Sequence, residues 1–279
     1  MERLQVAIEK ARALRGQTNP VRERGTVAEM DEAPELGPVA EAWEALTPLT
    51  LNNRSLTRNR VRTMDQGSES APFDLLRTRM LQLCKQNSWR RVAIVSPHAA
   101  CGKSTTALNL AFSLARQQDL HSLVFDFDMR RAGLTKMLEQ TVAHDISAVL
   151  EGSVSFAEQG LRYGDNVGFG LGGSSKVKNP SEILQSQQTK AVLDEIEASY
   201  QPDLMLFDMP PLLASDDNFG FLQNVDCALI MVAAEETRMS QIDLAERQVA
   251  ELTNVMGVVL NKCRHTAHSQ HAYDYNYYY

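Results

Sequence analysis

Short apolar runs alternate with segments of helical periodicity through most of this chain. The runs that predict strands are residues 91–96, 122–126, 204–208, 227–233 and 257–261. Segments between them, such as 103–116 and 240–253, repeat apolar residues at helical spacing. Continuous apolar strands that alternate with helices are typical of an α/β fold, with a mostly parallel central sheet and helices on both faces. Ligands of such sheets bind at the carboxyl ends of the strands.

A glycine-lysine-serine-threonine motif opens the helix after the first predicted strand. It comprises Gly102, Lys103, Ser104 and Thr105. The helix N-terminus offers free N–H groups to phosphate oxygens, the lysine adds a positive charge, and the serine hydroxyl can bind Mg²⁺. This strand–loop–helix context predicts a phosphate-binding loop, with ATP and Mg²⁺ as cofactors.

The first half of the loop departs from the common G-x-x-x-x-G-K-[ST] pattern. Pro97 replaces the first glycine, and Ala99 and Ala100 stand where flexible residues are common. An alanine held at a positive φ costs about 1 kcal/mol. The sequence therefore leaves open whether the altered loop supports full activity.

Three aspartates lie at the ends of predicted strands. Asp126 and Asp128 follow the second strand, and Asp208 ends the third, just before two prolines. Alternate residues of a strand share a face, so the first two carboxylates can point into one cavity, and Mg²⁺ prefers oxygen ligands. A single aspartate at a strand end is most often a turn or cap residue. Three of them beside a phosphate loop predict a metal–nucleotide site.

Composition limits the other functions. The net charge of −7 and the pI of about 5.4 argue against a general nucleic-acid binder, which needs a basic surface. Four widely spaced cysteines without a C-x-x-C pair fit a reduced cytoplasmic protein better than a disulfide framework or a zinc site. Because no stretch approaches the roughly 20 apolar residues of a membrane helix, we expect any membrane role to come through a partner.

The chain divides into three expected regions. We expect an N-terminal helix and flexible arm over residues 1–70, a catalytic domain over 71–264, and a flexible tail over 265–279. The tail contains five of the chain's seven tyrosines, which are Tyr273, Tyr275, Tyr277, Tyr278 and Tyr279. A tethered run of phenols beside an ATP site suggests self-phosphorylation, whereas the alternative is a frayed terminus.

Together these segments resemble the bacterial tyrosine autokinases of polysaccharide export, which share a P-loop NTPase fold with partitioning and septum-site ATPases. The resemblance runs from about residue 73 onward. It rests on the phosphate loop, the D-x-D-x-R strand end at 126–130, the Walker B pattern at 208–211, the segments 179–184 and 257–261, and the tyrosine cluster. Partitioning ATPases look similar but carry a signature lysine four residues before the last loop glycine, where this chain has His98.

The resemblance implies a role for each matching residue. It implies an ATP-binding set of Gly102, Lys103, Ser104, Thr105, Arg130 and Asn261, the last as the adenine contact. It implies Mg²⁺ ligands Ser104, Asp126 and Asp208, and catalytic residues Lys103, Asp126, Asp128 and Asp208. A phenol has an unperturbed pKa of about 10, so a carboxylate must accept its proton during transfer. The sequence leaves open whether Asp126 or Asp128 does so.

The resemblance also implies an activity, a location and partners. The activity is that of a non-specific protein-tyrosine kinase, which phosphorylates its own tail in trans and so regulates polysaccharide polymerisation and export. The partners are an inner-membrane polysaccharide co-polymerase that activates the kinase, a phosphotyrosine phosphatase and other copies of the chain. The expected location is cytoplasmic, peripherally at the inner membrane through that co-polymerase.

Two other functions remain open from the sequence. One is a non-kinase ATPase switch of the partitioning type, and the other is a degenerate nucleotide-binding module. Ring assembly is open as well, because the family's E-x-x-R-x-x-R motif is matched here by Ala71, Asp74 and Arg77.

Overall fold

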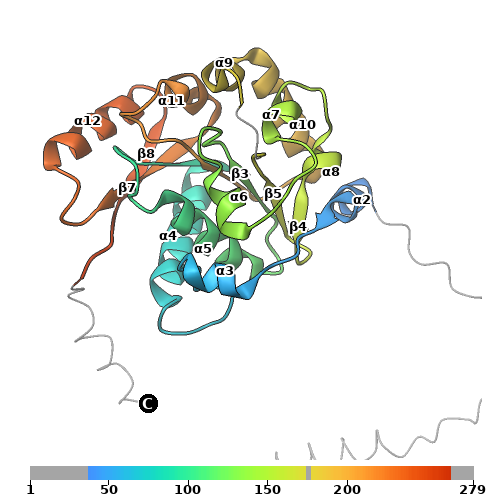
Figure 1. Ribbon diagram of the computed structural model, residues 1–279, viewed down its shortest axis with the longest axis horizontal. Helices are drawn as coiled ribbons and strands as arrows, with labels where there is room; N and C mark the ends of the chain where they lie inside the picture. Colours follow the sequence, from blue (N-terminus) through green and yellow to red (C-terminus); the bar gives the residue numbers. More distant parts are fainter. Residues whose placement is uncertain (1–36, 174–176, 265–279) are drawn as a thin grey trace, which may run out of the picture. The chain divides into compact units, whose positions relative to one another are not determined.

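The computed structural model describes residues 37–173 and 177–264. In chain order its elements are α2 (Pro38–Ala45), β1 (Thr47–Pro48), α3 (Asn53–Arg58), α4 (Ala71–Asn87), β2 (Arg91–Val95), α5 (Lys103–Ala115), β3 (Ser122–Asp126), α6 (Gly133–Leu138), α7 (Ile146–Leu150), α8 (Phe156–Gln159), β4 (Leu161–Tyr163), β5 (Val167–Gly170), α9 (Pro180–Gln185), α10 (Gln187–Tyr200), β6 (Leu204–Asp208), α11 (Asp217–Phe221), the 3-10 helix η1 (Leu222–Asn224), β7 (Cys227–Ala233), α12 (Met239–Ala250) and β8 (Asn254–Asn261). Figure 1 shows how they are arranged.

These strands form one sheet in the order β1-β4-β5-β3-β6-β2-β7-β8. Neighbouring strands run parallel except for β4 and β5, which pair antiparallel. The predicted α/β fold with a mostly parallel central sheet is confirmed. The order places β6 between β3 and β2, so three of the predicted site segments leave the sheet side by side.

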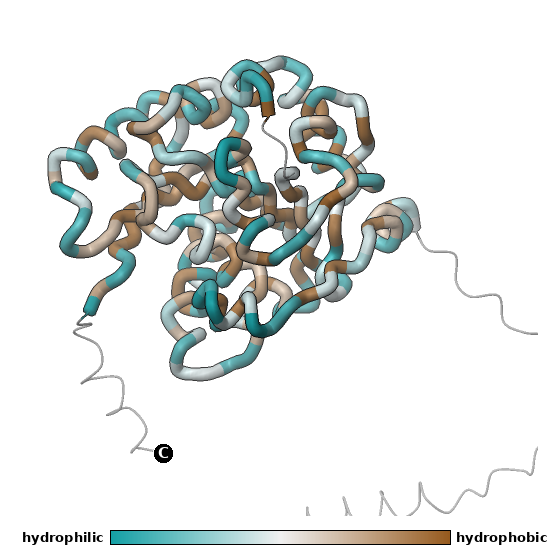
Figure 2. The backbone as a smooth tube through the Cα atoms, viewed as in Figure 1, coloured by the Kyte–Doolittle hydropathy of each residue, from teal (hydrophilic) through white to brown (hydrophobic). Residues whose placement is uncertain are grey.

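Two apolar layers cover the two faces of the sheet. Along β3, Leu123 and Phe125 enter one layer and Val124 enters the other. Helices α4, α5 and α6 contribute to the second layer, whereas α7, α10 and α11 contribute to the first. Figure 2 shows hydrophobic strands in the interior and more hydrophilic segments around them. Burial on both faces explains why the strands read as continuous apolar runs.

The described part of the expected arm, residues 37–70, is folded onto the sheet. Trp43 is buried and its indole N–H donates to the carbonyl of Tyr200 at 2.8 Å. Leu46 is buried as well, and the following strand β1 extends the sheet beside β4. The expectation of a flexible arm is therefore corrected for this stretch, because its few large apolar side chains are enough to anchor it. The expected helix at 1–15 and the tyrosine tail lie outside the described residues.

Two further differences have local causes. The helix predicted over 182–199 is two helices, because Ser186 is extended (φ −69°, ψ 147°) and its hydroxyl caps α10 by accepting from the N–H of Thr189. The stretch 152–178, which the sequence left unassigned, contains α8 and the antiparallel pair β4 and β5. Its hairpin turns at Gly164, which has a φ of +59°.

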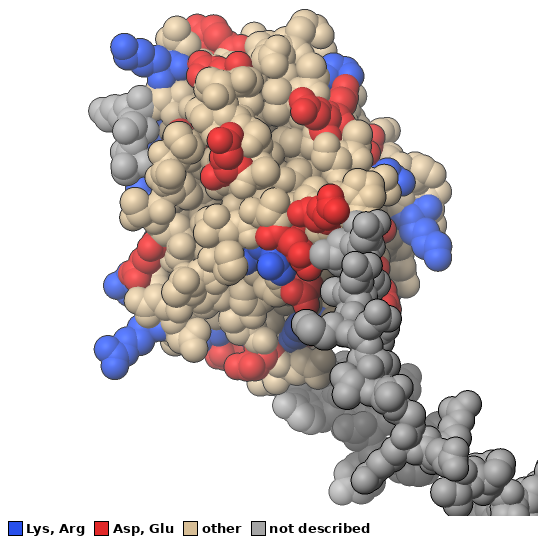
Figure 3. Space-filling view, turned by 90° about the vertical axis from the view of Figure 1, so that its right-hand side faces the viewer, with Lys and Arg blue, Asp and Glu red and all other residues tan. Residues whose placement is uncertain are grey.

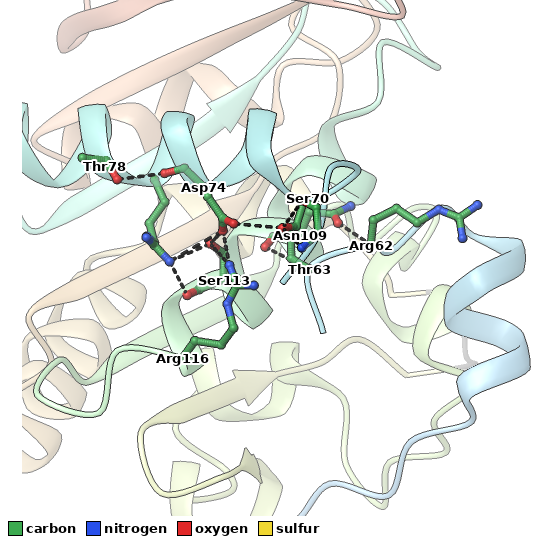
Figure 4. Close-up of polar contacts among 10 residues, drawn as sticks. Arg62, Thr63, Ser70, Asp74, Thr78, Asn109, Ser113 and Arg116 are labelled. Atoms are coloured by element: carbon green, nitrogen blue, oxygen red, sulfur yellow. Dashed lines mark hydrogen bonds and ion pairs between the residues drawn. The ribbon is translucent and has the colours of Figure 1, made fainter. Parts of the chain in front are cut away.

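A buried asparagine fastens the N-terminal segment to the helix that follows the phosphate loop (Figure 4). The side chain of Asn109 accepts from the N–H of Arg62 at 2.7 Å and donates to the carbonyls of Arg60 and Thr105 at 3.1 and 2.8 Å. The hydroxyl of Thr63 donates to the Asn109 carbonyl at 2.6 Å. These bonds fix residues 60–63 against α5.

Replacing this side chain is expected to destabilise the fold. Asn109→Leu keeps the approximate volume but removes the hydrogen bonds of the buried Asn109 side chain to the part-buried backbone of residues 60 and 62, so the free energy of unfolding should fall by about 2–3 kcal/mol. Chemical denaturation measures this change. Asn87→Leu, at an exposed position at the end of α4, is the matched control and should stay within about 0.5 kcal/mol of wild type. An equal effect of both substitutions would contradict the anchoring role.

Polar residues of α4, the helix before β2, form hydrogen bonds and ion pairs within the chain. Asp74 on α4 accepts from Ser70 at 2.9 Å and from Ser113 at 2.5 Å, and it pairs with Arg116 (Figure 4). Arg77 donates to the carbonyl of Ser113 at 2.8 Å. Two of the three positions that match the family's ring-forming motif are thus occupied by contacts to α5.

Candidate nucleotide and magnesium site

The loop between β2 and α5 contains two residues in the left-handed region. Ala100 has a φ of +63° and Gly102 a φ of +92°, whereas Ala99 is not among the residues with positive φ. The backbone cost foreseen for an alanine in this loop therefore applies to Ala100. A Cβ on Gly102 would also collide with the side-chain amide of Asn261, which donates to the carbonyl of Cys101 at 2.9 Å. The end of β8 thus packs directly on the loop.

The predicted phosphate and metal ligands converge beside this loop. Lys103 begins α5 and is only 7% exposed, and its charge acts on the carboxyls of Asp128 and Asp208. A Cβ placed on Gly133 would lie 2.6 Å from Ser104 Oγ and 3.6 Å from Asp208 Oδ2. One amine, one hydroxyl and the carboxylates therefore meet at the carboxyl ends of β2, β3 and β6. Thr105 follows in α5 and is half-buried.

Two aspartates of the site are completely buried and incompletely bonded. Asp126 and Asp208 are register partners on β3 and β6, and both are 0% exposed. Asp126 Oδ2 accepts from the backbone N and Oγ1 of Thr135 at 3.1 and 3.2 Å. Among the described residues, Asp126 Oδ1 and both carboxylate oxygens of Asp208 have no hydrogen-bond partner. Because buried polar atoms are nearly always satisfied, these free oxygens fit the ligand set of a cation.

The donor set also indicates which cation fits. Within the part of the chain that the structure describes, His, Cys, Asp and Glu side chains form no group of three or more that could hold a metal. Mg²⁺ usually keeps several waters and uses one or two carboxylates together with substrate phosphates. Asp126, Asp208 and the Ser104 hydroxyl match this pattern, with the remaining ligands supplied by nucleotide and water.

Burial raises the pKa of all three strand-end carboxyls. Burial, followed by the charge of Asp208, holds the pKa of Asp126 well above its usual range. Burial raises the pKa of Asp208 to about 6 against the opposing charge of Lys103. Burial also raises the pKa of Asp128, where Lys103 and Arg131 oppose it. Because a bound cation needs charged carboxylates, we expect metal affinity to weaken as pH falls through these pKa values.

Arg130, which the resemblance implied as an ATP-binding residue, forms an ion pair within the chain. Its guanidinium forms a two-bond ion pair with Asp217 on α11, at 2.8 and 2.9 Å. Asp217 is 1% exposed and also accepts from Ser181 and Ser215. The end of β3 is thereby tied to α9 and α11. Asp217 at the start of α11 and Thr135 in α6 were not predicted from the sequence, because a lone aspartate or threonine carries no recognisable pattern.

His98 stands where partitioning ATPases carry their signature lysine. Its Nδ1 lies 2.8 Å from the carbonyl oxygen of Ala99, and its Nε2 lies 2.9 Å from Thr237 Oγ1. The Thr237 hydroxyl in turn accepts from the N–H of Ala233 at 2.9 Å. The imidazole thus braces the phosphate loop against the end of β7. The five tail tyrosines predicted as phosphoacceptors lie outside the described residues.

Comparisons with known proteins agree with this geometry. The family model for the CobQ/CobB/MinD/ParA nucleotide binding domain matches residues 92–277. Tyrosine-protein kinase ptk of Acinetobacter johnsonii is 30% identical over 172 residues, which cover 61% of this chain and 23% of that protein. Tyrosine-protein kinase YwqD of Bacillus subtilis (strain 168) is 29% identical over 216 residues, which cover 76% of this chain and 88% of that protein. The matched segment is thus about a quarter of the first relative and most of the second.

A solved structure shows the same fold. The kinase domain of Escherichia coli tyrosine kinase ETK matches with a TM-score of 0.64 and 23% identity, over 72% of this chain and 79% of that one. The predicted resemblance to bacterial tyrosine kinases is confirmed. Septum site-determining protein MinD of Helicobacter pylori is 27% identical over 155 residues, which are 54% of this chain and 56% of that protein. It gives the partitioning alternative weaker support. In residues 37–173 and 177–264, no helix has the length and apolar character needed to cross a bilayer.

Proposed function

We propose that this chain, which belongs to the CobQ/CobB/MinD/ParA family of nucleotide-binding domains, is an ATP-dependent protein-tyrosine kinase that phosphorylates its own tyrosine-rich tail in trans. The observation that carries the proposal is the pair of buried, incompletely bonded carboxylates of Asp126 and Asp208 beside the phosphate loop. An ATPase site alone does not explain five clustered tyrosines in the same chain. A kinase site that uses a phenol as its acceptor explains them.

The residues of the site divide the chemistry among them. The N-terminus of α5 and Lys103 would bind the phosphates, while Asp126, Asp208 and Ser104 would hold Mg²⁺, which would neutralise phosphate charge. A carboxylate at the end of β3, Asp126 or Asp128, accepts the phenol proton. The phenol oxygen then forms a bond to the γ-phosphorus as the bond to the leaving ADP oxygen breaks. Asn261, whose side-chain amide donates to the carbonyl of Cys101 in the loop, is the proposed adenine contact.

The test is a phosphotyrosine map of the purified full chain after incubation with Mg²⁺ and ATP. Mass spectrometry should place phosphate on some or all of residues 273, 275, 277, 278 and 279, and chelation of Mg²⁺ should abolish it. Calorimetry on the same sample reports ATP binding independently. If ATP binds but the tail carries no phosphotyrosine, the kinase proposal fails and a nucleotide-binding switch replaces it.

Two specific observations support the two alternative functions, a degenerate nucleotide site and a partitioning-type switch. The strained Ala100 and the missing glycine at Pro97 favour a weak or degenerate nucleotide site, which predicts no calorimetric ATP signal. The family's inclusion of partitioning ATPases favours a switch, which predicts nucleotide-dependent dimers and hydrolysis without phosphotyrosine. The same two measurements therefore separate all three functions.

The cellular role follows the kinase relatives. We infer a role in polysaccharide polymerisation and export, with activation by a membrane co-polymerase that brings the cytoplasmic chain to the inner membrane. A phosphotyrosine phosphatase would reset the tail. Phosphates at several tail sites add negative charge, which disfavours close packing of copies of the chain.

A further inference from the structure

A cavity of about 400 Å³ lies at the carboxyl ends of β3 and β5, next to α6. It is lined by residues that include Met129, Arg130, Arg131, Thr135, Lys136 and Val142. These residues follow β3 or belong to α6 and its exit, and Gly172 and Gly173 after β5 complete the lining (Figure 1). The volume is within the usual range of about 300–1,000 Å³ for ligand sites.

The cavity shares one lining residue, Thr135, with the surroundings of the Asp126 carboxyl. Thr135 lines the cavity, and its backbone N–H donates to Asp126 Oδ2 at 3.1 Å. The Thr135 hydroxyl lies within hydrogen-bonding distance of two acceptors, Asp126 Oδ2 at 3.2 Å and the carbonyl oxygen of Gly172 at 3.0 Å. The strand order places this cavity at β5 and β3, the metal ligands at β3 and β6, and the phosphate loop at β2. A nucleotide on the loop, the metal and a molecule in the cavity would thus lie in sequence along one edge of the sheet.

The cavity has two cations available to a ligand. Arg130 is committed to Asp217, and the lining carboxylate, Glu139, is held by Arg58 at 2.5 Å and by Asn52 at 2.8 Å. The other two cations, Arg131 and Lys136, are exposed and form no ion pair with any described residue, although the charge of Arg131 also acts on the Asp128 carboxyl.

This positive pair lies in a chain that is acidic as a whole. The chain has a net charge of −7, and on the face drawn in Figure 3 acidic side chains gather in several groups. Apolar Met129, Ala132 and Val142 also line the cavity and offer a surface for a ring. The cavity therefore suits an aromatic residue with an anionic neighbour, and the tail has this composition at Tyr273, Asp274 and Tyr275.

We propose that this cavity is the acceptor subsite and that it selects tyrosines flanked by an anionic side chain. Asp274 supplies that anion at first, and a phosphotyrosine formed earlier supplies a stronger one as the cluster is modified. Arg131 and Lys136 attract the anion electrostatically, while the ring of the next tyrosine lies toward Asp126 and Asp128. The proposal rests on the kinase function but adds a substrate preference to it, namely acidic or already phosphorylated tyrosine segments.

The test is a binding measurement that needs no phosphoryl transfer. Fluorescence anisotropy follows a labelled peptide of residues 271–279 binding to the full chain with Mg²⁺ and ADP. The peptide is used unmodified, with Asp274→Asn, and phosphorylated at Tyr275. The protein variants are the double substitution Arg131→Gln/Lys136→Gln and the matched control Arg79→Gln/Lys85→Gln, which removes two exposed cations from α4.

The phosphorylated peptide should bind wild type most tightly and the Asp274→Asn peptide most weakly. Arg131→Gln/Lys136→Gln should weaken binding of the phosphorylated peptide by about 5- to 30-fold, and the control should leave it within about 2-fold. Equal losses in both double variants, or none in either, would overturn the subsite. If the wild-type chain still phosphorylates its tail in that case, the kinase function stands without this subsite. Peptide binding at the cavity without any phosphotyrosine would instead count against the kinase function alone.

Discussion

Asp208→Asn is expected to stabilise the nucleotide-free protein at neutral pH while reducing phosphoryl transfer by at least 10²- to 10³-fold, an order-of-magnitude expectation for a lost electrostatic group. The Asp208 carboxyl is 0% exposed, stands opposite Asp126 and has no hydrogen-bond partner among the described residues. Its charge is unfavourable until a cation arrives. The neutral amide removes that cost and also removes the cation ligand.

The raised pKa of Asp208 determines how the stability of the folded chain changes with pH. The pKa of Asp208 is raised from 3.8 to about 6 in the folded chain, so the charged form destabilises the fold above about pH 6. The wild-type apo protein should therefore gain stability as pH falls from about 6 toward 4, because the folded state takes up the proton first. The advantage of Asp208→Asn should be full above about pH 6 and disappear over the same window.

Denaturation curves at several pH values, with and without Mg²⁺ and ATP, measure both parts of the prediction. Mg²⁺ with ATP should stabilise wild type at neutral pH and have little effect on Asp208→Asn. Asp119→Asn, at an exposed position before β3, is the matched control and should follow wild type throughout. A variant that is less stable than wild type at neutral pH would show that the favourable charge of Lys103 outweighs the cost of burying the Asp208 carboxylate.

Lys103→Met is expected to abolish measurable tail phosphorylation and to weaken ATP binding by about 1–3 kcal/mol. The methionine keeps an unbranched side chain at a position that is only 7% exposed, so the loss reports the charge more than the packing. Removing that charge also removes an interaction that lowers the pKa values of Asp128 and Asp208. The carboxyls should then protonate at higher pH, which weakens the metal site further.

Calorimetric titration with ATP and the rate of phosphotyrosine formation measure the two losses separately. Lys85→Met on the exposed face of α4 is the control and should match wild type in both. Lys103→Arg should not restore activity, because the planar guanidinium does not fit the space of a buried ammonium group. ATP affinity that is unchanged in Lys103→Met would contradict the role of this lysine in phosphate binding.

Much of the fold and the donor half of the site could be predicted from the sequence. The strands at β2, β3 and β6 are buried on both faces, so their apolar runs are unmistakable, and the phosphate loop lies at a strand–helix junction. Asp126 and Asp208 were recognisable because each ends such a strand. The sheet order then explains why they meet, since β6 lies between β3 and β2.

The rest depends on contacts between distant parts of the chain. The segment at Trp43 reads as a polar linker with few apolar residues, and it folds only because α10 and the sheet offer those residues a place. Asp217 forms its ion pair with Arg130 across 87 residues of sequence, which no local pattern reveals. Thr135 is part of the site only through its contacts with Asp126 Oδ2. Such partners become visible only in three dimensions.

Phosphorylation in trans can be measured directly by mixing two variants. One is Lys103→Met with an intact tail, which serves only as acceptor, and the other has Phe at all five tail tyrosine positions and serves only as enzyme. After incubation with Mg²⁺ and ATP, mass spectrometry should find phosphotyrosine in residues 273–279 of the Lys103→Met chain, and none when either variant is incubated alone. An unmodified Lys103→Met tail in the mixture, although the Phe variant binds ATP, would contradict the proposed trans-autokinase.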